Sequence, residues 1–134
     1  MQDSKLKELV LSTLDGFFAI CKLNPQTKIP NWSLKGEFYS ITRTSEELSI
    51  LCPQKIIPDE ITYVGRWRGL KIEGPFKFTE IGILNSITAP LASVNISLLS
   101  ISTFDTDYVF IQDDQFEDAL LILAANGHEV PSTD

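Results

Sequence analysis

Residues 99–112, which read LSISTFDTDYVFIQ, predict the hairpin that decides the fold. The apolar run from Ile96 to Thr103 predicts one strand and Tyr108 to Gln112 predicts another, because short apolar runs bounded by turn residues are typical of strands. Phe104-Asp105-Thr106 lies between the two strands and predicts the turn.

Strand and helix patterns flank this hairpin on both sides. Before the hairpin, a strand is predicted over Trp67–Glu73 and a helix over Thr79–Val94, which Pro90 should bend or interrupt. After the hairpin, a second helix runs from the capping box Asp114–Glu117 to Ala125, and Asn126-Gly127 ends it. A short strand is predicted over His128–Val130. From about Arg66 the order is strand, helix, strand, strand, helix, strand, which is the split βαβ arrangement.

The first half of the chain contains a second hairpin but weaker helix signals. A helix is predicted over Lys5–Leu14, where apolar residues recur at helical spacing, and a strand over Phe17–Leu23. Residues 24–36 predict an irregular crossover, Phe38–Thr44 and Glu47–Cys52 predict paired strands, and Pro53–Glu60 leaves room for one helical turn.

The two hairpins align as an internal repeat. Tyr39–Thr42 aligns with Leu99–Ser102, and the same register pairs Glu47 with Asp107. Duplication followed by shrinkage of the first copy's helices explains this pattern. We therefore expect an α+β protein of two tandem ferredoxin-like (βαββαβ) units with antiparallel sheets and helices on one face: an N-terminal helix over 1–15, a degenerate first unit over 16–64 and a second unit over 65–134.

Composition excludes several classes of function. The chain has 134 residues, a net charge of −7 and 43% hydrophobic residues, which suits a small acidic globular protein. The negative charge disfavours binding to nucleic acid or anionic membranes, and no apolar stretch approaches the roughly 20 residues that span a bilayer. Cys21 and Cys52 are too few for a disulfide scaffold or a thiolate metal site. Because the first residues lack the layout of a secretory signal, we expect a cytoplasmic protein.

Two motifs carry a resemblance to a known family. Residues 73–84, EGPFKFTEIGIL, and residues 101–109, ISTFDTDYV, resemble the ACT-domain family, and more narrowly the small bacterial proteins made of two tandem ACT units. Those are related to the ACT domains of aspartate kinase and of the cytosolic arginine sensor. The resemblance implies side-by-side ferredoxin-like units that bind an amino acid where two units meet, without a cofactor. It also implies that any regulated partner is a separate protein.

The residues of these motifs are chemically suited to an amino-acid zwitterion. Thr79 at the start of the predicted helix would leave the amides of Glu80, Ile81 and Gly82 free to bind a carboxylate. Asp107 could bind the ammonium group or a cationic side chain. The resemblance places ligands at the loop before the first helix and at the hairpin, so the candidate site comprises Phe78, Thr79, Glu80, Ile81, Gly82, Thr103, Thr106 and Asp107.

Structural roles for the same residues remain open. Gly82 could instead allow close packing of a helix on a strand, Asp105 and Asp107 could be turn residues, and Asp113 and Asp114 are expected to cap the following helix. An alternative function is a protein-interaction or dimerisation module without a ligand, and a homodimer is expected in either case.

Catalysis is the least favoured function. His128 is the only histidine and lies far in sequence from either cysteine. No nucleophile, acid and base appear together, and there is no recognisable metal motif. We therefore expect a protein that is not an enzyme and holds no metal.

Overall fold

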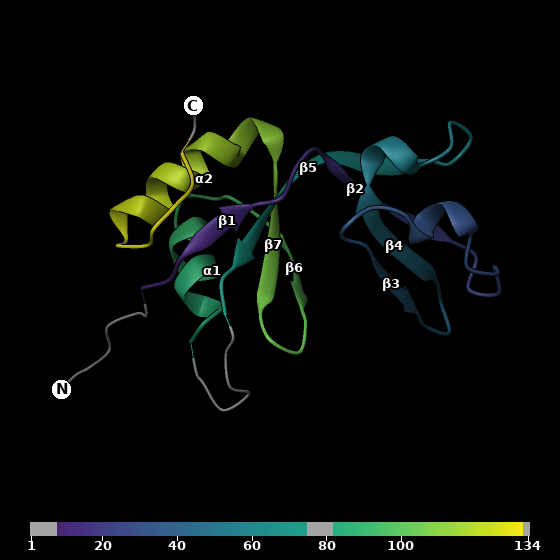
Figure 1. Cartoon of the computed structure of the whole chain (residues 1–134), viewed down its shortest axis with the longest axis horizontal. Helices are drawn as coiled ribbons and strands as arrows, with labels where there is room; N and C mark the ends of the chain where they lie inside the picture. The colour runs from purple at the N-terminus through teal and green to yellow at the C-terminus, as the bar shows by residue number, and fades with distance from the viewer. Residues whose placement is uncertain (1–7, 75–81, 133–134) are drawn as a thin grey trace. The chain divides into compact units, whose positions relative to one another are not determined.

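The computed structural model describes residues 8–74 and 82–132, which divide into two compact units. The continuous unit is Asp15–Trp67, and the split unit combines Met1–Leu14 with Arg68–Asp134. Strand β5 (Tyr63–Ile72) contributes its first five residues to the continuous unit and the remainder to the split unit. Figure 1 labels the helices and strands of both units.

The continuous unit is an antiparallel sheet with little helix. Its strands are β2 (Phe18–Leu23), β3 (Ser40–Arg43), β4 (Leu48–Pro53) and the start of β5, in the order β3-β4-β2-β5. Its helical segments are two short 3₁₀ turns, η1 (Asn31–Leu34) and η2 (Gln54–Ile56). Cross-strand pairs such as Cys21↔Ile50 and Ile41↔Ile50 set the register. The buried residues of this sheet form their own core: Ala19, Cys21, Leu48, Ile50, Cys52 and Ile57.

The split unit combines a sheet with two α-helices. Its strands are β1 (Leu11–Thr13), the end of β5, β6 (Leu99–Ser102) and β7 (Asp107–Gln112), in the order β1-β5-β7-β6. The helices are α1 (Asn85–Ala92) and α2 (Asp113–Ala125), which lie beside the strands in Figure 1. Helices and sheet share one core, whose fully buried members are Leu70, Ile72, Ile87, Leu91, Val109, Ile111, Ala119 and Leu123. The expected α+β, ferredoxin-like fold class is confirmed.

The predicted N-terminal helix over Lys5–Leu14 is wrong for the residues that the structure describes. Leu11–Thr13 form strand β1, antiparallel to the end of β5, with Leu11 opposite Ile72. Burial here has a period of two, because Leu9 and Leu11 are 6% and 4% exposed whereas Val10 is 46% exposed. The strand forms because the edge of β5 offers unpaired backbone groups to it. β1 thus takes the place of the fourth strand, and the predicted strand over His128–Val130 is reduced to one parallel bridge between Val10 and Glu129.

Both predicted helix starts in the split unit also need correction. Helix α1 begins at Asn85, and Gly82 lies outside it with a φ of +84°; the predicted start at Thr79 lies outside the described residues. Helix α2 begins at Asp113 without a side-chain cap, so Asp113 and Asp114 lie in its first turn and the predicted capping box is wrong. Carboxylates there still interact favourably with the helix dipole. The predicted stop at Gly127 is confirmed by its φ of +93°.

The two hairpins repeat each other, but one residue away from the alignment made on sequence. The Thr44 amide donates to the Glu47 carbonyl at 2.9 Å, and the Thr103 amide donates to the Thr106 carbonyl at 2.8 Å. Thr44 therefore corresponds to Thr103, and Leu48, rather than Glu47, corresponds to Asp107. The shrinkage of the first copy's helices is confirmed, since β4 leads into the three-residue η2 whereas β7 leads into the thirteen-residue α2.

Candidate functional site

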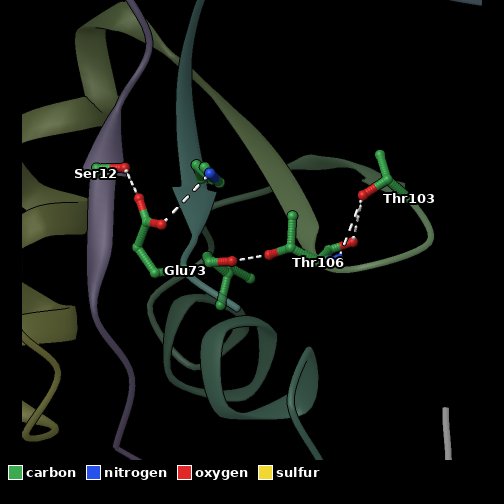
Figure 2. Close-up of polar contacts among 6 residues, drawn as sticks. Ser12, Glu73, Thr103 and Thr106 are labelled. Atoms are coloured by element: carbon green, nitrogen blue, oxygen red, sulfur yellow. Dashed lines mark hydrogen bonds and ion pairs between the residues drawn. The ribbon is translucent and has the colours of Figure 1, made fainter. Parts of the chain in front are cut away.

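The end of β5 in the split unit carries an ionised carboxylate. Ser12 Oγ on β1 donates to Glu73 Oε2 at 2.5 Å, and Lys71 Nζ lies 3.4 Å from Glu73 Oε1 (Figure 2). The hydrogen bond from Ser12 lowers the pKa of Glu73 below its ordinary value, the Lys71 charge adds to this shift, and partial loss of solvent opposes it. Glu73 is the first residue of the 73–84 motif, whose later residues the sequence assigns to ligand binding.

The β6–β7 turn is fastened to the same end of β5. Thr106 is 8% exposed, and its hydroxyl donates to the backbone carbonyl of Ile72. Thr103 Oγ1 donates to the Thr106 carbonyl at 3.1 Å and accepts from the Thr106 amide at 3.3 Å (Figure 2). The structure thus brings the hairpin and the start of the 73–82 segment together. Both threonine hydroxyls make structural hydrogen bonds here.

Asp107 begins β7 and is partly exposed. It lies opposite Ser102 on β6, whose hydroxyl donates to Asp107 Oδ1 at 2.5 Å. This bond orients the carboxylate while leaving part of it open to solvent.

Gly82 is a turn residue that leads into α1. Its carbonyl accepts from the Ser86 amide at 2.9 Å and from the Ser86 hydroxyl at 2.8 Å. Its position outside the helix contradicts the prediction that its amide belongs to the first helical turn. Phe78, Thr79, Glu80 and Ile81, the remaining predicted site residues, lie outside the described part of the chain.

His128 links the residues before β1 to helix α1 through two buried hydrogen bonds. The Leu9 amide donates to His128 Nδ1 at 3.0 Å, and His128 Nε2 lies 2.9 Å from the Ser86 carbonyl. Since Nδ1 accepts, Nε2 carries the proton and donates to Ser86. Pro90 explains why that carbonyl is available, because a residue with an N–H four positions after Ser86 would otherwise bond to it within α1. Both ring nitrogens are therefore occupied in holding the residue segment before β1, helix α1 and the C-terminal segment together.

Sequence reasoning missed Ser12, Lys71 and Glu73 as members of this cluster. Ser12 and Glu73 are 61 positions apart, and the contact requires β1, which the sequence pattern presented as a helix.

Among residues 8–74 and 82–132, no group of three or more His, Cys, Asp or Glu side chains could hold a metal ion. Across those same ranges, no helix has the length and apolarity to cross a bilayer.

Family models match both halves of the chain. The family model of the ACT domain matches residues 63–125, and a model described as the N-terminal domain of another family matches residues 16–60. The cytosolic arginine sensor for mTORC1 subunit 1 of Rattus norvegicus is 36% identical over 69 residues, which are 51% of this chain and only 21% of that protein.

Solved structures resemble the chain over most of its length. A crystal structure of an Agrobacterium tumefaciens protein is 36% identical, with a TM-score of 0.88 and 93% of each chain covered. The regulatory subunit of aspartate kinase from Thermus flavus is 10% identical, with a TM-score of 0.61, 90% of this chain and 99% of that one covered. Because the Thermus flavus subunit is only 10% identical, its likeness to this chain concerns the fold alone.

Proposed function

Because the chain belongs to the ACT-domain family, we propose that it is a non-catalytic, cytoplasmic regulatory protein that binds a free amino acid at the end of β5 in its split unit. The observation that carries the proposal is the hydrogen bond from Thr106 to Ile72, together with the Ser12–Glu73 contact. These bonds hold the hairpin and Glu73 at one end of β5. A ligand there would meet groups from both regions that the sequence identified.

The charges of this unit favour an amino acid with a cationic side chain. The split unit contains twelve acidic and five basic residues, so it carries the whole net charge of −7. Glu73 and Asp107 are carboxylates at the proposed site, where one can bind the α-ammonium group and the other a cationic side chain. The relative named as an arginine sensor makes arginine the first ligand to test.

Thermal-shift screening of the twenty amino acids tests the proposal. A ligand at about 100 times its dissociation constant adds about 2.7 kcal/mol to the stability of the folded state. For a chain of this length we expect the melting temperature to rise by several degrees, and most with arginine. If no amino acid raises the melting temperature, the ligand-binding proposal fails and the interaction module is favoured.

Asp107→Asn locates the ligand more precisely. Asparagine keeps the oxygen that accepts from Ser102, so the hairpin should survive while the charge is lost. Loss of one charge-assisted hydrogen bond costs about 1.5–3 kcal/mol, which is roughly a ten- to hundredfold loss of arginine affinity in calorimetry. Asp114→Asn removes a carboxylate from α2 in the same unit and should leave affinity within about twofold, because Asp114 is an exposed residue of the first helical turn.

We also propose that the protein forms a homodimer. β6 lies at the end of the strand order of the split unit, and an outer strand offers backbone groups to another chain. Light scattering should return twice the 15.0 kDa mass of the chain. A mass of one chain at high concentration would contradict this.

A further inference from the structure

The continuous unit contains a cavity that the proposed amino-acid site does not use. Its volume is about 630 Å³, within the range of small-molecule pockets. Three segments line it: Asp15–Phe17 before β2, Pro53–Lys55 at the end of β4 and in η2, and the connection that carries Ile57, Asp59 and Tyr63. All of these residues belong to the continuous unit.

The cavity borders the position where this unit has lost a helix. In the split unit, the strand β7 continues into α2, whose buried residues Phe116 and Leu120 fill the space beside the sheet. In the continuous unit, the corresponding strand β4 continues only into η2. A three-residue turn cannot present the successive helical turns that would occupy that space. The residues of η2 line a cavity instead.

The walls of the cavity are held in place by several contacts. The Gln54 amide donates to the Phe17 carbonyl at 2.9 Å, and Gln54 Oε1 accepts from the Arg66 amide at 2.7 Å. The Arg66 guanidinium lies 4.5 Å from the centre of the Phe17 ring. Gly65 leaves room for the Gln54 side chain, which a Cβ at that position would meet. A pocket with fixed walls loses less entropy when a ligand binds.

Arg66 shows that this arrangement is maintained at a cost. Its φ is +63°, which is unfavourable for a residue with a side chain, and it lies at a bulge where β5 shifts register against Phe18 and Ile20 of β2. Such strain persists only where surrounding contacts hold it, and it concentrates at binding sites. Here the contacts that hold it come from Gln54 and Phe17, which are both residues of the cavity wall.

The lining indicates the chemical class of the ligand. Asp15 and Asp59 contribute two carboxylates to the lining against the one ammonium group of Lys55, and Phe17 and Ile57 contribute apolar surface. The Arg66 guanidinium lies against the Phe17 ring and is not part of the lining. The continuous unit as a whole has six acidic and six basic residues, so these local charges decide its preference. We propose that this cavity is a second ligand site, which binds a small organic cation with an apolar body, such as an arylalkyl ammonium ion. This site does not depend on the proposed function of the split unit.

Two probes with the same phenylethyl body and opposite charge test the assignment. The ¹⁵N-labelled full chain is titrated with 2-phenylethylammonium chloride and, separately, with sodium 3-phenylpropionate, and backbone amide shifts are followed by NMR. The ammonium probe should move the amides of Gly16, Phe17, Gln54 and Lys55 with saturation in the millimolar range. The carboxylate probe should bind at least tenfold more weakly.

Charge-removing variants identify the groups responsible. The double variant Asp15→Asn, Asp59→Asn should weaken the ammonium probe at least tenfold, with an unchanged melting temperature because both carboxylates are exposed. Glu46→Gln removes an exposed carboxylate from the β3–β4 turn of the same unit and should change affinity less than twofold.

Several results would overturn the assignment. One is the absence of amide shifts at millimolar 2-phenylethylammonium, and another is equal binding of 3-phenylpropionate. Shifts confined to the split unit, or full affinity in the double variant, would equally show that the cavity is not a cation site.

Discussion

Replacing His128 with phenylalanine should destabilise the split unit substantially. The ring is 5% exposed, accepts a hydrogen bond from the Leu9 amide and donates one to the Ser86 carbonyl. Phenylalanine retains a flat apolar ring at this position but offers neither a donor nor an acceptor. Two buried backbone groups, 77 positions apart in sequence, would then be left without partners.

The size of the effect follows from those two groups. A buried polar group without a partner costs about 1–3 kcal/mol, so the two groups left by His128→Phe should lower the free energy of unfolding by about 2–6 kcal/mol. With an unfolding entropy of about 2.1 cal/mol/K per residue, this corresponds to a fall in melting temperature of roughly 7–21 °C. An exposed histidine would give a change within about 0.5 kcal/mol.

A second substitution tests which carbonyl His128 binds. Pro90→Ala introduces an N–H four residues after Ser86, and that N–H can bond to the Ser86 carbonyl within α1. In the Pro90→Ala background, the carbonyl keeps a partner when His128 is removed. The cost of His128→Phe should therefore be smaller there by about 1–2 kcal/mol, which is the saving from one satisfied group.

Urea unfolding of the four proteins, followed by circular dichroism, gives the complete cycle. Amide hydrogen exchange at Leu9 provides a local check, because its protection should fall in both proteins that lack His128. If the two substitutions are additive within about 0.5 kcal/mol, the Ser86 carbonyl is not the partner of His128. If His128→Phe alone costs less than about 1 kcal/mol, neither hydrogen bond contributes and the reasoning is refuted.

Three further predictions concern other contacts. Burial, with a smaller contribution from the Cys21 thiol, raises the pKa of Cys52 to about 12. The free energy of unfolding should therefore fall by about 1 kcal/mol as the pH rises from 9 to 10, because the thiol ionises more readily in the unfolded chain. Urea unfolding of Cys52→Ala should show a flatter decline over this range. Ser12→Ala should raise the pKa of Glu73 towards its ordinary value, measurable by ¹³C NMR titration; an unchanged pKa would exclude the hydrogen bond as its main cause. Gln54→Ala should cost about 0.5–1.5 kcal/mol in urea unfolding and speed hydrogen exchange at the Arg66 amide, whereas unchanged exchange would show that Gln54 does not hold the bulge.

The sequence predicted the hairpin of the candidate site well. The hairpin of Thr103, Thr106 and Asp107 is coded by contiguous residues, with apolar strands on each side of a turn, and its hydrogen bonds form as local turn chemistry dictates. The conformation at Gly82 was harder to predict. Gly82 was assigned to a helix because apolar residues around it follow helical spacing, yet the chain there adopts a positive φ that ends any such helix.

The contact of Glu73 with Ser12 could not be predicted from the sequence. Ser12 lies in a short apolar run, and the pattern of such a run is compatible with either a helix or a strand. The choice between them depends on the free edge of β5, which exists only after the strand has folded. The same holds for the one-residue error in aligning the two hairpins, since the true register is set by which amide and carbonyl meet in the folded turn.

By itself, the sequence determined the α+β class, the two repeated hairpins and the resemblance to the ACT-domain family. These depend on local patterns of apolar, turn and capping residues, which act over a few positions. The tertiary structure alone decided that residues 11–13 complete the split unit, that His128 links three segments, and that a shortened helix borders a cavity in the continuous unit. Those features depend on backbone groups and surfaces that are distant in sequence and need partners only when the folded core removes them from water.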